Sequence, residues 1–435
     1  MFAANDTAEA LAKALATAAG WRLTVTSSAR LSMGMDDGEL GGAYSPPRKV
    51  QEVSGSVFIV WEDGTVSKGL VSGSTIEQLK TKMSMWRSAA YRDDDAAHIA
   101  PLAEPAPVGL SDPRVAKVVQ QSPRLAFDTL TAIASTARKA GADNVDASVA
   151  CAAGNTVTAT STGLWVSYAH TSLSCGWVLN KSFAMWRLGR ALETWKGLEP
   201  MVASTGEMLA ASRNRVELAG GRVRVIFWPA VVDQLVQHYL VHNLSGDMVV
   251  EKRSRFSLDQ FAAGHAAFRN DFSLELDTTI PMAPGSYPCT DEGIPGSKVV
   301  LVDGGRLVTP LLNTKYARKS GLAPTALPAA GLSPGYAGFR LRLGEPLAYG
   351  AMLSSADEAL LVTGVLGMHT QDPVSGNFSL AASDALLVKE GRLVGAAKVV
   401  ISGNFFDILG DSDTAAAVHP AYETPALAGV CRVEA

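Results

Sequence analysis

The sequence is poor in cysteine and contains no long apolar run. Its four cysteines, Cys151, Cys175, Cys289 and Cys431, are scattered without a CxxC pair. This pattern is typical of unpaired, mostly buried thiols in a reducing compartment. No apolar stretch approaches the ~20 residues that a membrane-spanning helix needs. The opening MFAANDTAEALAKALATAAG lacks a basic segment and indicates an amphipathic helix rather than a signal peptide. We therefore expect a soluble cytoplasmic protein that does not enter a membrane.

Several motifs that would identify a mechanism are also missing. The chain has no phosphate-binding loop, no GxGxxG opening a helix after a strand, no GxSxG elbow and no calcium loop. Its net charge of −4 and pI near 6.0 provide no basic field for phosphates. These absences argue against nucleotide-dependent enzymes, serine hydrolases and nucleic-acid-binding proteins.

The chain is long enough for two domains. It has 435 residues, which is more than a single compact core usually holds. Hydrophobic residues make up 47% of it, enough for a sizeable core. Helical and alternating patterns mix in residues 1–195, with a hairpin signal at Asp63–Gly64. Residues 196–435 contain mostly short strands broken by glycine. We predict an α+β fold with an N-terminal helix-and-strand domain, and a C-terminal, mainly antiparallel, barrel-like sheet with one packed helix.

Local patterns predict individual strands and helices. Ala153–Gly154 predicts a turn between strands at 144–152 and 155–164, and residues 183–195 read as a helix. Alternating Val and Ile predict a strand at Arg222–Trp228. Pro229 suits the first position of a helix, about 230–243, which Gly246 would close.

The helix at about 230–243 is the place where a metal would bind. His238 and His242 are four residues apart, so an α-helix would place them on one face, as two metal ligands must lie. In zinc peptidases of the H-E-x-x-H type a glutamate general base follows the first histidine, but here that residue is Tyr239. The alternative is that the two histidines border the apolar face and find hydrogen-bond partners nearby. His419 or Cys431 would supply a third ligand only if the fold brought it to the helix.

The C-terminal half contains a series of short polar and glycine-bearing segments: Thr290–Gly296 (TDEGIPG), Gly304–Leu307, Asn313–Ala317, Gly367–His369 with Pro373–Ser379, and Val400–Asn404. In their order and spacing these segments resemble the TldD/PmbA family of intracellular metallopeptidase subunits, also described as modulators of DNA gyrase. The N-terminal half agrees more loosely, through the Val57–Gly69 hairpin and the strands at Ala147–His170.

The resemblance implies a degenerate metal motif. The metal-binding TldD branch carries H-E-x-x-x-H followed by x-L-x-G-D, and His242 to Asp247 matches the end of this pattern. In that register Gln237 replaces the first histidine and His238 replaces the glutamate. The spacing of His238 and His242 is then a coincidence. His419 is the only His or Cys between Asn404 and Pro425, where the branch has a further cysteine ligand.

These departures resemble the PmbA/TldE branch. The resemblance implies a subunit that binds no metal, supplies no catalytic residue and pairs with a TldD-like H-E-x-x-x-H subunit. Zinc in that partner would cut unfolded or leader peptides, while this chain supplies chamber wall and interface. His369 and Asn377, in a polar loop, are candidates for peptide contacts.

Two other functions stay open from the sequence alone. One is an autonomous metalloenzyme that uses His238, His242 and a third ligand such as His419. The other is a peptide-binding module of a modified-peptide pathway that acts without cleavage.

Overall fold

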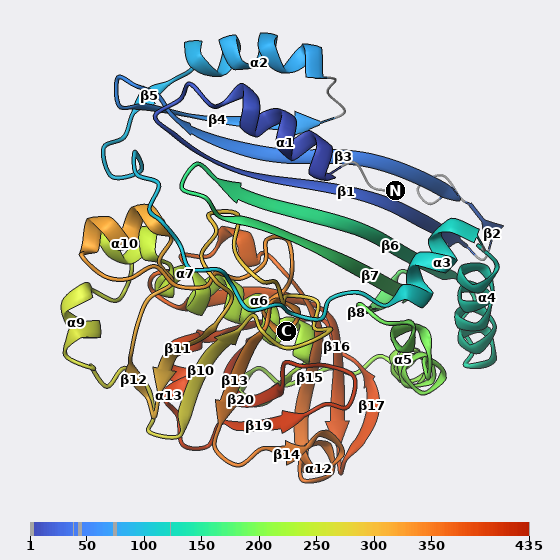
Figure 1. Cartoon of the computed structure of the whole chain (residues 1–435). Helices are drawn as coiled ribbons and strands as arrows, with labels where there is room; N and C mark the ends of the chain where they lie inside the picture. Colours follow the sequence, from blue (N-terminus) through green and yellow to red (C-terminus); the bar gives the residue numbers. More distant parts are fainter. Residues whose placement is uncertain (1–3, 38, 42–45, 73–75, 122, 435) are drawn as a thin grey trace.

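The computed structural model describes residues 4–37, 39–41, 46–72, 76–121 and 123–434. They form the expected α+β fold, in which an open N-terminal sheet lies beside a C-terminal half that contains a barrel (Figure 1). Within the described residues, no helix is both long enough and apolar enough to cross a membrane.

The N-terminal sheet is antiparallel, with the order β5-β4-β3-β1-β6-β7-β8 and β2 paired to β1. Its strands are β1 (Gly20–Asp36), β2 (Glu39–Leu40), β3 (Arg48–Val60), β4 (Thr65–Ser72), β5 (Tyr91–Arg92), β6 (Val145–Thr160), β7 (Trp165–Leu179) and β8 (Ser182–Gly189). The helices of this region are α1 (Ala4–Ala14), α2 (Ile76–Ser88), α3 (Pro113–Gln121), α4 (Arg124–Lys139), the 3-10 turn η1 (Leu192–Trp195) and α5 (Glu199–Ser212).

The two faces of this sheet differ in chemistry because side chains alternate along each strand. Leu23 and Val25 of β1 are buried with Leu11 of α1 in one apolar cluster. Figure 1 shows α1 on the side of the sheet away from the C-terminal half. The opposite face carries threonines in cross-strand pairs. The hydroxyl oxygens of Thr26 and Thr156 are 2.9 Å apart.

The C-terminal half contains a closed barrel. Within the described residues five strands run in the order β20-β18-β16-β15-β9, and pairing of β20 with β9 closes the ring. These strands are β9 (Gly221–Phe227), β15 (Glu358–Leu366), β16 (Asn377–Lys389), β18 (Val399–Asn404) and β20 (Ala426–Glu434). Three short strands extend this sheet: β14 (Leu347–Ala348), β17 (Arg392–Ala396) and β19 (Ala415–Val418). A separate sheet holds β10 (Phe272–Asp277), β11 (Lys298–Asp303), β12 (Arg306–Leu307) and β13 (Phe339–Leu343).

The C-terminal half has more helices than the single one that the sequence predicts. The extra ones are short and stand between strands, in glycine-rich segments that carry little helical periodicity. The helices are α6 (Pro229–Leu235), the π-helix η2 (Val236–Val241), α7 (His242–Leu244), α8 (Gly246–Val250), α9 (Leu258–Ala262), α10 (Thr314–Ser320), α11 (Pro334–Ala337), α12 (Tyr349–Ser354), the 3-10 turn η3 (Met368–Thr370) and α13 (Phe405–Gly410).

Two N-terminal predictions are wrong. Ala153–Gly154 is no turn, because β6 runs unbroken from Val145 to Thr160. A β-carbon on Gly154 would lie 2.9 Å from the His170 ring, so this glycine makes room for an imidazole. Residues 183–195 are not a helix either, since they form most of β8 followed by η1. The alternation in β8, with Phe183 and Met185 buried, is a strand pattern.

Polar contacts join the two halves. Arg22 of β1 donates to Glu292 at 2.6 Å, with side chains that are only 14% and 10% exposed. Glu292 also accepts from the backbone N–H of Thr314, at the start of α10, at 2.7 Å. Lys315 pairs with Asp93 at 2.7 Å. The glutamate of the TDEGIPG segment is therefore a structural tie between the sheet and the C-terminal half.

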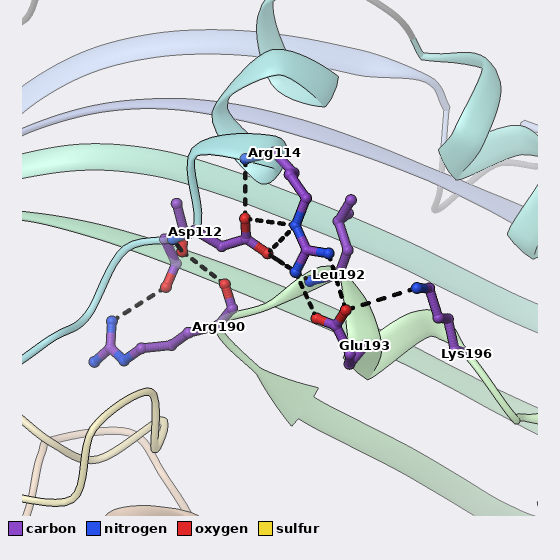
Figure 2. A network of polar contacts seen from close by, with 7 residues as sticks. Asp112, Arg114, Arg190, Leu192, Glu193 and Lys196 are labelled. Carbon is purple, nitrogen blue, oxygen red and sulfur yellow. Dashed lines mark hydrogen bonds and ion pairs between the residues drawn. The ribbon is translucent and has the colours of Figure 1, made fainter.

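A second network holds the irregular segment between β5 and α3. Buried Asp112 accepts from the Arg114 guanidinium at 2.8 Å and from the Leu192 N–H at 3.1 Å (Figure 2). Arg114 also pairs with Glu193 at 2.7 Å. The boundary predicted between residues 195 and 196 stays a prediction, because one apolar cluster runs through α4, β6 and the barrel.

Candidate functional site

The motif helix begins as the sequence predicts. Trp228 is extended, with φ −60° and ψ 147°, and Pro229 takes the first helical position, where its missing N–H costs no hydrogen bond. The helix ends at Leu244, one residue past the predicted end, but Gly246 does not close it: Ser245 is extended and Gly246 opens α8. A β-carbon on Gly246 would lie 2.5 Å from the Leu311 carbonyl oxygen, so glycine is needed there for close approach of two backbones.

The middle of this helix is a π-helix. Residues Val236–Val241 lie between the α-helical segments α6 and α7. A π-helix bonds residues five apart rather than four, which turns residues five apart toward the same side. This brings Gln237 toward the side of His242, and these are the two positions of the H-E-x-x-x-H histidines. His238 stays on that side as well, since all three residues line one cavity.

A cavity of about 840 Å³ opens beside the motif helix. Gln237, His238 and His242 line it from one side, and His369 lines it from the loop after β15. The fold thus brings the three motif positions on the helix together with His369, although His369 lies more than a hundred residues further along the chain. The remaining lining residues come from β8, α6, the end of β15 and the segments around α8, α11 and η3: Trp186, Ala230, Asp233, Gln234, Ser245, Gly331, Leu332, Ser333, Pro334, Val365, Leu366, Gly367 and Met368.

The two motif histidines differ in their hydrogen bonding. His238 Nε2 lies 3.1 Å from the Gln371 carbonyl oxygen, and its ring meets the Tyr239 ring edge-on at 4.7 Å. A carbonyl oxygen only accepts, so Nε2 of His238 carries the proton. His242 Nε2 is buried and has no hydrogen-bond partner among the described residues. Burial, and then the nearby His238, lower the pKa of His242, which favours the neutral imidazole.

The loop that carries His369 is fastened to the helix by two buried groups that the sequence analysis missed. Asn243 is fully buried and donates to the carbonyl oxygens of Tyr239 and Pro373, each at 2.8 Å. The Tyr239 hydroxyl donates to the Asn377 carbonyl oxygen at 2.9 Å. The sequence does carry a sign of this contact, because Asn243 lies on the apolar side of the predicted helix near its end. A buried side-chain amide needs hydrogen-bond partners, so an asparagine at such a position indicates a backbone segment packed against it.

A third buried group fixes the opposite wall of the cavity. Asp233 accepts from Ser333 Oγ at 2.8 Å, from the Gly335 N–H at 2.9 Å and from Thr424 Oγ1 at 2.6 Å. Burial raises the pKa of this carboxyl group even with three donors around it. Two of these bonds hold the loop at 331–335, so Asp233, which also lines the cavity, fixes the position of that loop.

Asn377, predicted as a possible peptide contact, stands at the start of β16 and is exposed. Its side-chain oxygen accepts from Asn404 Nδ2 at 2.9 Å. Asn404 in turn caps α13 by accepting from the N–H groups of Phe406 and Asp407. Asn377 therefore belongs to the frame around the 371–377 loop.

His419 does not join the motif helix as a ligand. Its ring is enclosed by Trp228, Tyr349 and Tyr422, with centroids 4.6, 4.8 and 5.2 Å away. Nδ1 accepts from the Ala421 N–H at 3.2 Å, and burial lowers the pKa of His419 to about 4. Cys431 is buried on β20 opposite Val223 of β9.

Metal-ligating side chains are few around this cavity. Throughout the ranges that the structure describes, no three His, Cys, Asp or Glu side chains gather as ligands would. His238, His242 and His369 line the cavity without forming such a group, and His419 lies in its aromatic enclosure.

Parts of the chain are similar in sequence to known proteins. Residues 220–425 match the family described as the PmbA/TldA metallopeptidase C-terminal domain. The chain is 25% identical over 190 residues to an uncharacterized protein of Methanocaldococcus jannaschii, covering 42% of this chain and 43% of that protein. It is 26% identical over 196 residues to a metalloprotease of the same organism, covering 43% of this chain and 42% of that protein. The match thus spans less than half the length of these curated relatives.

The fold as a whole has a solved counterpart. The crystal structure of TldE from Thermococcus kodakarensis superposes with a TM-score of 0.81 at 17% identity, covering 98% of this chain and 100% of that one. At that identity the likeness shows the fold. Residues 220–425 are therefore similar to the PmbA/TldA metallopeptidase C-terminal domain, and the whole chain has the fold of that solved structure.

Proposed function

We propose that the chain is a TldE-like, non-catalytic subunit of a heterodimeric zinc metallopeptidase. Its partner would be a TldD-like subunit with an intact H-E-x-x-x-H motif, and the pair would cut unfolded or leader peptides in the cytoplasm. One observation carries the proposal: the cavity beside the π-helix keeps the motif backbone and His242 but presents Gln237 and His238 at the other two motif positions.

The substitutions remove the chemistry that the motif needs. A glutamine amide is a far poorer zinc ligand than an imidazole. A general base must accept a proton from zinc-bound water. His238 holds its Nε2 proton toward the Gln371 carbonyl oxygen, so this nitrogen is a donor. The cysteines are also compatible with a reducing compartment, because all four are free.

The chain would contribute shape and contact surface instead. The cavity of about 840 Å³ is large enough for several side chains of an extended peptide. Leu366 on its rim is 63% exposed, as a contact for apolar peptide side chains or for a partner subunit requires. His369, also exposed at the cavity, would supply a polar contact.

The test measures zinc content and peptide cleavage for the chain alone and for the chain with a TldD-like partner. We expect no stoichiometric zinc and no cleavage with the chain alone, and cleavage with the pair. Mutating the partner's motif histidines should abolish cleavage, whereas His242→Ala in this chain should change it little. Stoichiometric zinc and cleavage by this chain alone would contradict the proposal.

A non-cleaving, peptide-binding role is the second candidate. The unpartnered Nε2 of His242, a residue that lines the cavity, favours it, since a peptide N–H or O–H would satisfy that nitrogen. Binding of a leader peptide without cleavage, even with a TldD-like partner present, would support this role.

The autonomous metalloenzyme needs a third ligand beside His238 and His242. Retained activity in His242→Ala would exclude it.

A further inference from the structure

A second cavity lies between the two halves of the molecule, away from the motif helix. It has a volume of about 600 Å³. The threonine face of the N-terminal sheet forms one wall, through Thr26 and Thr156. The segment from Pro284 to Asp291 and the residues Leu327 to Ala330 form the other walls. None of its lining residues is shared with the motif cavity.

The cavity contains a cation with no counter-ion. Arg190 follows β8, and within the described part of the chain no carboxylate lies within ion-pairing distance of it. Its guanidinium donates to the carbonyl oxygens of Thr171, Ala283, Pro284 and Ser286 at 2.8 to 3.1 Å. These acceptors are neutral, so the positive charge stays uncompensated. Burial lowers the pKa of Arg190, the direction expected for an unpaired cation.

Two acidic groups on the far side of the Arg190 backbone are used elsewhere. Figure 2 shows the Arg190 side chain pointing away from the cluster of Asp112, Arg114 and Glu193. Asp112 and Glu193 are both bonded to Arg114. Four of the five N–H groups of Arg190 are occupied by carbonyl oxygens, and the remaining one is available to a ligand.

An unsatisfied donor lies beside this cation. Ser286 is 2% exposed and lines the cavity, and its Oγ has no hydrogen-bond partner among the described residues. Its own carbonyl oxygen is 3.0 Å from the Arg190 guanidinium, and both residues line this cavity. A buried hydroxyl of this kind normally has a partner, so its isolation indicates a missing ligand or water. A guanidinium and a hydroxyl together are the groups that bind a carboxylate.

Asp291 supplies the opposite charge. It lines the same cavity, is exposed, and forms no ion pair with any described residue. A cavity lined by an unpaired cation and an unpaired carboxylate is complementary to a ligand that carries both charges.

We propose that this interface cavity binds a small zwitterion, a free α-amino acid or a short peptide, with its carboxylate at Arg190 and Ser286 and its ammonium group at Asp291. The site is distinct from the motif cavity and does not depend on the proposed function. A ligand here contacts the sheet and the C-terminal half together, so it couples their relative positions.

The experiment is calorimetric titration of the full chain with L-alanyl-L-alanine, its N-acetylated form, its C-terminal amide, and L-alanine. We expect saturable binding of the dipeptide, and weaker binding of both blocked forms. Ser286→Ala should weaken dipeptide binding roughly tenfold, because it removes a hydrogen bond to a charged group. The variant loses no internal hydrogen bond and should therefore fold normally. Asp291→Asn should weaken dipeptide binding but leave binding of the N-acetylated form unchanged.

Thr414→Val is the matched control. Thr414 is 4% exposed and its hydroxyl also lacks a partner among the described residues, but it does not line this cavity. It should leave dipeptide binding unchanged. Equal binding of L-alanine and the dipeptide would identify free amino acids as the ligand class. The proposal is overturned if no probe binds saturably at millimolar concentration, if the amide binds as well as the dipeptide, or if Ser286→Ala binds like the unmodified chain.

Discussion

The N-terminal sheet and the C-terminal barrel bury apolar surface in different ways. The sheet is open, with α1 covering one face and threonines occupying the other. The barrel closes on itself through β9 and β20 and buries side chains such as Val225 and Phe227 completely. A closed barrel has no free edge within its ring. Of the two cavities described above, one lies against the polar sheet face and one beside the helix that follows β9.

The largest effect should come from cutting the tie between the two regions. Glu292→Ala leaves Arg22 without its partner in a site where both side chains are mostly buried. Removing one member of a buried ion pair costs about 3–5 kcal/mol. We expect urea unfolding to show a loss of this size, and earlier exposure of the sheet than of the barrel in hydrogen exchange.

Asp128→Asn is the control for that change. Asp128 pairs with Arg124 at 3.7 Å on the surface of α4, where the two side chains are 57% and 86% exposed. Surface pairs of this type contribute about 0.3–0.5 kcal/mol. A similar small loss for both variants would mean that Glu292 does not hold the halves together.

A smaller effect should appear on acidification. Burial lowers the pKa of His419, beside the barrel, and of His170, on the sheet, from 6.5 to about 4. A histidine with a lowered pKa binds its proton more readily when unfolded, so stability is lost as pH falls from about 6.5 to 4. Each residue would contribute at most about 3 kcal/mol. Unfolding of His419→Gln and His170→Gln at several pH values measures each share. If the acid-dependent loss is unchanged in both variants, the prediction is wrong.

The smallest effect concerns the helices that cover the sheet. Gly206 of α5 lies against α4, and a β-carbon there would stand 2.3 Å from Ala140 Cβ. Overpacking costs about 1–3 kcal/mol, partly offset by the better helix propensity of alanine. Gly206→Ala should therefore lower the free energy of unfolding modestly. Gly350 of α12 is the matched site, because a β-carbon there would meet no atom within 4 Å, and Gly350→Ala should be neutral or slightly stabilising.

The sequence predicted the fold best where local pattern and tertiary context agree. Arg222–Pro229 forms the predicted strand and helix start, because Val-Ile alternation suits a buried strand and proline suits the first helical turn. Gly154 was taken for a turn residue, but a glycine is needed there because a side chain would collide with the His170 ring on the neighbouring strand. The local sequence does not reveal that contact. Helix α5 was missed altogether, and residues 183–195 were assigned to a helix although they alternate as a strand does.

The candidate site was predictable in its residues but not in its assembly. The family resemblance selected Gln237, His238 and His242, and the structure brings His369 to the same cavity. That His419 is enclosed by three aromatic rings cannot be read from its sequence neighbours. The interface cavity was missed, although valine alternating with threonine in β1 and β6 was a visible sign of a sheet with one polar face.

The π-helix at Val236–Val241 constrains how this protein can vary. A π segment behaves as an α-helix with one residue inserted. Removing one residue would restore a regular helix and rotate everything after it by roughly 100°. That rotation would carry the fully buried Asn243 and its bonds to Tyr239 and Pro373 out of place. The segment therefore tolerates exchange of the side chains that face the cavity but not a change of length. The spacing of the motif positions is kept even where the metal-binding residues are replaced.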